Sequence, residues 1–249
     1  MSEFREILLC KYGEICLKGA NRSYFETLLS RELKYRLQQV GKYRVIKGRS
    51  LARIEPEDDS SDMDAAWRVA MHTFGIIAVS RSAYAEKEIG ELCRTAVEYL
   101  SDTLSAARTF KVEARRADKS FPLHSQQICE EIGAAILGNY HNLKVDVHHP
   151  DVTVMCEVRE EGAYITAGQQ HAAGGMPVGS NGKGLLLLSG GIDSPVAGWM
   201  MAKRGVIISA VHFQSPPYTS ERALIKVERL AAKMTEYCGQ ITLFVVPFT

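Results

Sequence analysis

Six consecutive residues, Ser189-Gly-Gly-Ile-Asp-Ser194, have the types and spacing needed to bind phosphate groups, and we call them the phosphate loop. Their two glycines let a ligand approach the main chain without a Cβ in the way. The apolar run 185–188 predicts a strand buried on both faces of a parallel sheet, and Pro195 suits the first turn of a helix. Main-chain amides and two hydroxyls would then converge on an anion, while Asp193 would cap the helix or hold Mg²⁺.

Other glycine-rich phosphate motifs do not fit this sequence. It has no G-x-x-x-x-G-K-[ST] run, and no G-x-G-x-x-G follows a strand. Lys183 precedes the strand, so it cannot act as the lysine of a Walker loop. A tight turn without a ligand would explain two glycines alone, but the polar residues around them favour a nucleotide site.

The residues on both sides of the phosphate loop predict the elements that position it. Downstream, helices and strands alternate as at the start of a doubly wound sheet. Their ranges are helix 195–203, strand 206–211, helix 220–237 and strand 241–246. Upstream, residues 168–184 hold six glycines and a proline, which indicates a linker or a loop that closes over a site.

The first 167 residues predict two smaller α/β units, separated by the acidic stretch 55–62, which also suits a helix N-cap. In the first unit we expect a strand at 7–10, a helix with apolar spacings of three and four from Phe25 to Val40, and a hairpin at 43–54. In the second we expect helices at 88–104 and 125–138 and strands at 76–83, 109–115, 145–147, 152–158 and 163–167.

The net charge of +1 averages three unlike segments. Residues 1–54 carry 12 basic and 5 acidic side chains, so +7. Residues 55–167 carry 11 basic and 20 acidic side chains, so −9. Residues 168–249 carry 7 basic and 4 acidic side chains, so +3. The basic first segment predicts a polyanionic partner such as nucleic acid, against the alternative of a solvated basic surface.

The composition excludes several classes of protein. A content of 46% hydrophobic and 24% charged residues is that of a globular protein, and no apolar run approaches the ~18 residues of a membrane span. The acidic N-terminus is unlike a signal peptide, and six cysteines without a C-x-x-C pair indicate the reduced thiols of a cytoplasmic protein. Cys10 and Cys156 fall on apolar strand faces, and Cys238 is the one cysteine that merits a test for sulfur transfer.

Several segments resemble one known family. Residues 11–25, which begin Lys-Tyr-Gly-Glu-Ile-Cys-Leu-Lys-Gly-Ala-Asn-Arg, resemble the opening signature of the tRNA 4-thiouridine synthetases. Residues 110–125 resemble the centre of a THUMP RNA-binding domain, and residues 174–183 and 211–221 resemble the segments that flank this family's ATP site. The phosphate loop itself resembles the SGGxDS loop of the PP-loop ATP pyrophosphatases.

The resemblance covers essentially the whole chain and implies a multidomain protein of α/β and α+β folds. It implies a ferredoxin-like N-terminal domain over 1–60, a THUMP domain over 61–168 and an incomplete doubly wound parallel-sheet PP-loop domain over 169–249. We expect a truncated chain, because a doubly wound sheet normally has about five strands and this PP-loop segment reaches only its third.

The resemblance also implies a reaction. ATP, with Mg²⁺ on its phosphates and no dedicated metal site, adenylates O4 of uridine 8 in tRNA. A persulfide charged by a cysteine desulfurase then replaces that oxygen and gives 4-thiouridine. Some members also supply sulfur for the thiamine thiazole, and a homodimer is left open. The sulfur-carrying cysteine would lie beyond Thr249, so we assign no catalytic residue and expect these 249 residues to be inactive in thiolation alone.

The resemblance assigns two sets of candidate binding residues. The ATP set comprises Leu187, Leu188, Ser189, Gly190, Gly191, Asp193, Ser194, His212 and Phe213. The tRNA set comprises Lys11, Lys18, Arg22, Arg115, Arg116 and Lys119. Lysine and arginine hold nucleic-acid phosphates by charge, although each of these six residues is equally compatible with an ordinary surface charge.

Two other functions stay open at this point. One is another PP-loop tRNA-modifying ligase, and the other is a non-catalytic RNA-binding protein with a vestigial nucleotide fold. The THUMP-like segment weighs against the first, and the intact phosphate loop weighs against the second. Nucleoside analysis of tRNA from a deletion strain tests the first alternative, and ATP binding by an Asp193→Ala variant tests the second.

Overall fold

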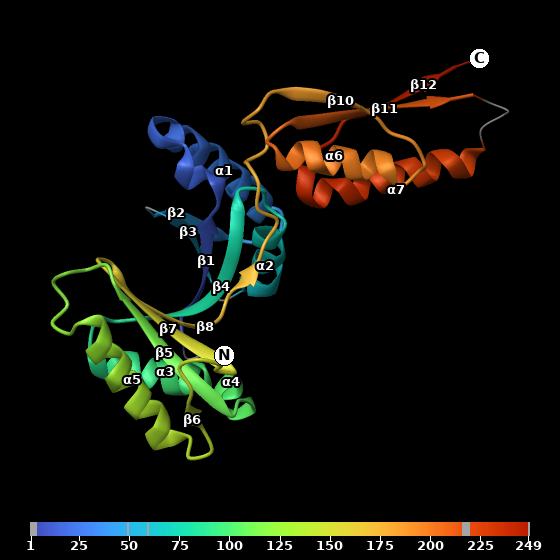
Figure 1. Cartoon of the computed structure of the whole chain (residues 1–249). Coiled ribbons are helices and arrows are strands. Elements are labelled where there is room, and N and C mark those ends of the chain that lie inside the picture. Colours follow the sequence, from blue (N-terminus) through green and yellow to red (C-terminus); the bar gives the residue numbers. More distant parts are fainter. Residues whose placement is uncertain (1–3, 49, 59, 216–219, 249) are drawn as a thin grey trace. The chain divides into compact units, whose positions relative to one another are not determined.

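The computed structural model describes residues 4–48, 50–58, 60–215 and 220–248 (Figure 1). Its contacts divide the chain into two units, and each is described here by itself. Unit 1 comprises Met1–Leu9 and Ser80–Gln170, and unit 2 comprises Cys10–Val79 and His171–Thr249. The chain passes from one unit to the other within strands β1 (Glu6–Tyr12), β4 (Ile76–Ala85) and β9 (Gln170–His171).

Unit 1 is a mixed β-sheet packed against helices. Strand β8 (Gly162–Ala167) pairs antiparallel with β4 and with β7 (Val152–Arg159). Strand β5 (Thr109–Arg116) runs parallel to β7 and to the short edge strand β6 (Lys144–Val145). The helices are α3 (Ile89–Tyr99), α4 (Ser101–Ala106) and α5 (Ser125–Asn139). Their apolar side chains form one core with the strands, including Leu92, Leu104, Phe110, Ile128, Ile132, Val154 and Ile165.

The helix that the sequence predicts over 88–104 is interrupted in unit 1. Leu100 has φ −94° and ψ 14°, and α4 starts afresh at Ser101, with Asp102 in its first turn. Serine and aspartate favour helix starts over helix interiors, which explains the break. Leu100 and Leu104 are both buried, so the apolar periodicity continues across the interruption.

The first half of unit 2 combines a β-hairpin with helices α1 (Arg22–Leu37) and α2 (Met63–Met71). Strands β2 (Tyr43–Lys47) and β3 (Leu51–Pro56) pair antiparallel, and β3 lies beside β1. The predicted apolar face of the first helix is confirmed for Leu28, Leu29, Leu33 and Leu37, which are buried. It is wrong for Val40, which is exposed because the helix ends at Leu37. The predicted acidic N-cap is confirmed too, because the Asp62 carboxylate accepts hydrogen bonds from the Asp64 and Ala65 amides.

The second half of unit 2 holds three parallel strands in the order β10 (Lys183–Leu187), β11 (Ile207–Gln214) and β12 (Leu243–Pro247). Helices α6 (Asp193–Lys203) and α7 (Glu221–Cys238) connect them. Figure 1 shows both helices on the same side of this sheet. The helices and strands bury a common core that includes Leu188, Ile208, Ala210, Val227, Ala231 and Met234. No helix in the described parts of the chain is long and apolar enough to cross a membrane.

The prediction that the strand before the phosphate loop is buried on both faces is wrong for the described residues. Leu185 and Leu187 are 63% and 67% exposed, whereas Leu188 is 2% exposed. The physical reason is that α6 and α7 cover only one face of the sheet. An apolar run records which residue types a strand contains and does not record which elements cover it.

The glycine-rich segment before β10 is ordered by main-chain hydrogen bonds within unit 2. The Gly174 amide donates to the Ile76 carbonyl over 2.7 Å, and the Met176 amide donates to the Lys203 carbonyl over 2.8 Å. Gly175 has φ +75°, and a Cβ there would lie 2.3 Å from the Lys203 carbonyl oxygen. The segment is therefore packed against β4 and the end of α6, and only glycine fits at residue 175.

Candidate nucleotide site and RNA-facing loop

The phosphate loop begins where β10 ends. Leu187 lies opposite Val211 of the parallel strand β11, and the Leu188 amide donates to the Val211 carbonyl over 2.9 Å. Helix α6 begins at Asp193, within the loop's last two residues. The strand, turn and helix predicted from the sequence are therefore confirmed. The loop lies at the carboxyl end of a parallel strand, which is where open α/β sheets bind ligands.

The two serines of the phosphate loop face each other across the turn. The Ser189 amide donates to Ser194 Oγ over 3.0 Å, and the two hydroxyl oxygens are 3.2 Å apart. The Gly191 amide donates to Ser189 Oγ over 3.3 Å. These bonds hold the turn closed and gather hydroxyl and amide groups at one place. A hydroxyl both donates and accepts, so each serine can also donate to a phosphate oxygen.

The N-terminus of α6 is open to a ligand. Its N-cap residue Ile192 is 80% exposed, and no side chain caps the helix. Asp193 is the first helical residue, so it is not the cap that its sequence position suggested, and its carboxylate is exposed. First-turn amides without a side-chain acceptor favour an anion, and an exposed carboxylate beside them fits Mg²⁺ shared with phosphates. Among the described residues, no three His, Cys, Asp or Glu side chains form a metal-binding group.

Strand β11 places His212 beside the phosphate loop. His212 Nδ1 lies 3.0 Å from the Leu188 carbonyl oxygen, which can only accept, so Nδ1 carries the hydrogen. His212 therefore braces the start of the loop. The next residue, Phe213, is 52% exposed and offers an aromatic face. Of the flanking signature predicted over 211–221, residues 216–219 lie outside the described part of the chain.

The basic residues predicted to contact tRNA in unit 2 extend from the end of β1 to the first residue of α1. Two 3-10 turns, Glu14–Leu17 and Gly19–Asn21, occupy the predicted loop. Lys18 Nζ lies 5.3 Å from the centre of the Phe25 ring. Arg22 Nε lies 2.6 Å from Glu26 Oε1, so part of its charge is balanced within the chain. Lys11 is half-buried near the end of β1.

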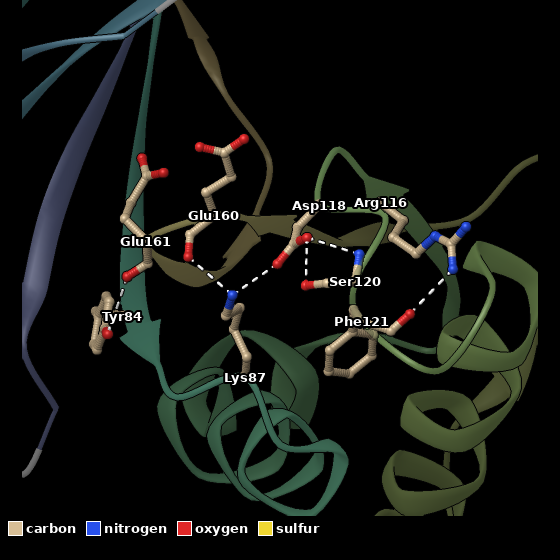
Figure 2. Close-up of polar contacts among 8 residues, drawn as sticks. All are labelled: Tyr84, Lys87, Arg116, Asp118, Ser120, Phe121, Glu160 and Glu161. Carbon is tan, nitrogen blue, oxygen red and sulfur yellow. Dashed lines mark hydrogen bonds and ion pairs between the residues drawn. The ribbon is translucent and has the colours of Figure 1, made fainter.

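The other basic residues predicted to contact tRNA lie in unit 1, at or near residues 117–124, which we call the THUMP loop. Arg115 and Arg116 immediately precede this loop, and Lys119 lies within it. Arg115 and Lys119 are exposed. Arg116 points back into the loop, and its guanidinium donates to the Phe121 carbonyl over 3.1 Å (Figure 2). It also donates to the Leu123 carbonyl over 3.5 Å. The three cations therefore divide into two exposed charges and one that shapes the loop.

A buried carboxylate that the sequence analysis did not single out fixes the start of the THUMP loop. Asp118 is 8% exposed, and its Oδ1 accepts from the Ser120 amide over 2.8 Å and the Ser120 hydroxyl over 2.7 Å. Lys87 Nζ lies between Asp118 Oδ2, at 2.7 Å, and the Glu160 carbonyl oxygen, at 2.9 Å (Figure 2). Hydrogen bonds from Lys87 and Ser120 hold the pKa of the Asp118 carboxyl well below its usual range. The Asp-x-Ser spacing signals the local turn, but no local pattern points to Lys87.

The cysteines are free thiols, and burial raises the pKa of most of them. Cys10 and Cys156 lie in the core as predicted, with the pKa of Cys156 raised to about 12. Cys238 is 2% exposed, and burial raises its pKa to about 11. Burial also raises the pKa of Cys93 and Cys129. A raised pKa disfavours the thiolate that sulfur chemistry requires.

Three family descriptions match successive parts of the chain. The ThiI ferredoxin-like domain matches residues 7–80, the THUMP domain matches residues 86–167, and the family described as thiamine biosynthesis protein (ThiI) matches residues 179–249. Curated relatives carry the name probable tRNA sulfurtransferase. The chain is 44% identical over 245 residues to the relative from Caldanaerobacter subterraneus subsp. tengcongensis and 45% identical over 247 residues to the one from Acetivibrio thermocellus.

Over nearly its whole length, the chain is similar to proteins named probable tRNA sulfurtransferase. The resemblance to the tRNA 4-thiouridine synthetase family is confirmed, with the domains in the predicted order. The chain spans about 63% of the length of each of these two relatives, which in turn match 98% of it.

Solved structures agree on the fold. A crystal structure of a 4-thiouridine synthetase–RNA complex with bound ATP has a TM-score of 0.87 and 37% identity, and the match covers 98% of this chain and 62% of that one. The crystal structure of PH1313 from Pyrococcus horikoshii has a TM-score of 0.82 and 26% identity, and the match covers 98% of this chain and 80% of that one. The predicted ferredoxin-like, THUMP and PP-loop folds are thereby confirmed.

Proposed function

We propose that this protein is an ATP-dependent tRNA sulfurtransferase that makes 4-thiouridine. The observation that carries the proposal is the phosphate loop, at the carboxyl end of a parallel strand, in a chain that also matches ferredoxin-like and THUMP domains. Sulfur transfer to tRNA is supported by the names of the curated relatives. Binding of both RNA and ATP is supported by the 4-thiouridine synthetase–RNA complex with bound ATP. The site supplies the anion chemistry that such a reaction needs.

The phosphate loop binds the phosphates of ATP through its amides. Gly190 and Gly191 allow the phosphates to approach the main chain, and the Ser189 and Ser194 hydroxyls add donors. Asp193 would hold Mg²⁺, which would neutralise part of the negative charge on the nucleotide. At the ends of β10 and β11, Leu187, His212 and Phe213 form the wall for the base, and Leu188, whose side chain is buried in the core, contributes its main chain.

The chemistry proceeds in two displacements on the tRNA. O4 of uridine 8 attacks the α-phosphorus of ATP, and pyrophosphate leaves, so that a poor leaving oxygen becomes a good one. The terminal sulfur of a protein persulfide, charged by a cysteine desulfurase, then attacks C4, and AMP leaves. A second thiol cleaves the remaining S–S bond and releases 4-thiouridine. The same persulfide serves the thiamine thiazole in our proposal.

The 249 residues bind ATP and tRNA in this proposal without completing thiolation. The support is the state of their thiols, since burial raises the pKa of five of the six cysteines: Cys10, Cys93, Cys129, Cys156 and Cys238. Formation of 4-thiouridine by the purified chain with tRNA, ATP and a desulfurase would contradict this. The free thiols also fit a cytoplasmic location.

Titration calorimetry of the purified chain with Mg·ATP tests the nucleotide site. In Gly191→Ala, the new Cβ lies 3.4 Å from Ser189 Oγ, so the loop accommodates it. In our proposal, the methyl group keeps the phosphates away from the main chain. We expect the ATP affinity to fall roughly tenfold or more, because the main chain can no longer approach the ligand.

Gly138→Ala is the matched control. Gly138 lies on α5 in unit 1, and a Cβ there meets nothing within 4 Å. We expect it to leave ATP binding unchanged. Equal ATP affinity in the Gly191→Ala variant and the parent chain would remove the phosphate loop from the nucleotide site. No ATP binding by the parent chain at millimolar concentration would refute the proposed nucleotide site as a whole.

A further inference from the structure

Helix α7 places a lysine against the phosphate loop. A Cβ built on Gly190 would lie 3.6 Å from Lys226 Cδ, so the aliphatic part of this lysine lies over the loop's first glycine. The ammonium group is only two bonds beyond Cδ. We infer that Lys226 binds the β- and γ-phosphates of the nucleotide, an inference that rests on the ATP site proposed above.

The core of unit 2 holds Lys226 in this place. Its neighbour Val227 is fully buried, and Ala231, one turn later, is 7% exposed. Both belong to the core that contains Leu188, the residue immediately before the phosphate loop. The rotation of α7 about its axis is therefore fixed by packing, and Lys226 lies at the edge of the core, with its side chain exposed.

The charge of Lys226 is available to a ligand. No hydrogen bond or ion pair joins its ammonium group to another described residue. Lys233, two turns further along α7, instead has its Nζ 2.7 Å from Glu236 Oε1. Lysine is a compact, flexible point charge, which suits phosphate oxygens.

The phosphate loop needs such a cation from outside its own sequence. Its six residues include one carboxylate, Asp193, and no basic side chain. Lys183 begins β10, at the strand end opposite to the loop, so it cannot supply the charge. Lys226 is the basic residue that contacts a glycine of the loop in the described part of the chain. It therefore takes the place that a lysine within the loop has in Walker motifs.

This position makes Lys226 a residue that distinguishes ATP from AMP. In Lys226→Met, we expect the affinity for Mg·ATP to fall about 10- to 100-fold, the range of a hydrogen bond to a charged group. The affinity for AMP should change less than twofold. Methionine keeps the length and the helix propensity of lysine, so the melting temperature should stay the same.

Arg229→Met is the charge-matched control, since Arg229 is exposed on the same helix about one turn away. Titration calorimetry with Mg·ATP, AMP and inorganic pyrophosphate compares the two variants with the parent chain. Loss of ATP and pyrophosphate affinity in Lys226→Met alone supports the assignment. Unchanged ATP affinity, an equal loss for AMP, or an equal loss in Arg229→Met overturns it while the ATP site itself stands. Failure of the parent chain to bind ATP overturns both proposals together.

Discussion

The phosphate loop of unit 2 and the THUMP loop of unit 1 hold their shapes by different means. Residues 189–194 close through two serines five positions apart and then enter a helix, so the hydrogen bonds that close the turn are local in the sequence. Residues 117–124 depend on Lys87, which is 31 positions from its partner Asp118. A loop closed by its own residues can be recognised from its sequence, whereas a loop closed by a distant ion pair cannot.

The two loops also differ in whether their charged side chains are exposed to a ligand or hydrogen-bonded within the protein. The phosphate loop has an exposed carboxylate and takes its cation from another helix. The THUMP loop and the end of β5 before it carry cations of their own, but one of them, Arg116, donates to carbonyl groups of the loop. Counting basic residues in a motif therefore overstates the number that face RNA.

The largest expected effect concerns Arg116. Arg116→Ala leaves the Phe121 and Leu123 carbonyls without this donor, which should lower the free energy of unfolding of unit 1 by about 1–2 kcal/mol. Hydrogen exchange of residues 109–124 measures the loss. Arg115→Ala is the control, because Arg115 is exposed and a surface change usually costs under about 0.5 kcal/mol.

The salt dependence of tRNA binding should change more in Arg115→Ala than in Arg116→Ala, the reverse of the order expected for stability. Arg115→Ala should reduce the salt slope by about one if this side chain contacts one phosphate. Arg116→Ala should weaken binding at all salt concentrations with little change in slope. A reduced slope in Arg116→Ala together with unchanged exchange rates would show that Arg116 contacts phosphate directly and would remove the contrast between the two residues.

The contrast between Arg115 and Arg116 shows where sequence reasoning stops. The sequence predicts a strand over 109–115, and its resemblance to a THUMP domain predicts cations there that contact tRNA; the structure has the strand at Thr109–Arg116. Whether a basic side chain is available to RNA depends on carbonyl groups several residues away. The periodicity of the sequence does not indicate those contacts. The same limit applies to Arg22, which is paired with Glu26.

Packing sets a second limit. The ranges predicted for α6 and α7 agree with the structure within two residues at each end, and Pro195 marks the first turn of α6 locally. The exposure of Leu185 and Leu187 depends instead on which side of the sheet those helices cover. The contact between Lys226 and Gly190 cannot be predicted from the sequence for the same reason, because it depends on the rotation of α7 against the core.

An intermediate effect is expected for Asp118→Asn. The substitution weakens the bridge from Lys87 to the THUMP loop, so Arg115 and Lys119 are held less firmly. Affinity for tRNA should fall several-fold, from the added cost of ordering the loop on binding. The salt slope should stay the same because no phosphate contact is lost. Glu160→Gln is the matched control, since Lys87 uses the carbonyl of that residue and not its carboxylate.

The contribution of Asp118 to stability should depend on pH. Its pKa in the folded state lies well below 3.8, the ordinary value, because of Lys87 and then Ser120. The stabilisation is therefore fully present above about pH 4 and is lost as the pH falls from there through the lower folded value. Urea unfolding should show a difference between the parent chain and Asp118→Asn that is constant from pH 7 to pH 5 and shrinks in stronger acid. A difference that grows in acid would contradict this assignment.

The smallest effect is expected for Ser189→Ala, and it tests whether the phosphate loop binds mainly through its main chain. The hydroxyl accepts from the Gly191 amide over 3.3 Å, a long bond, whereas Ser194 Oγ accepts from the Ser189 amide over 3.0 Å. Loss of one neutral hydrogen bond of about 0.5–1.5 kcal/mol corresponds to a roughly two- to tenfold loss of affinity, and we expect Ser189→Ala at the low end of this range. Ser194→Ala should cost more, because it also opens the turn. Titration with Mg·ATP ranks the variants, and a loss in Ser189→Ala as large as that in Gly191→Ala would mean that hydroxyl groups, and not amides, carry phosphate binding.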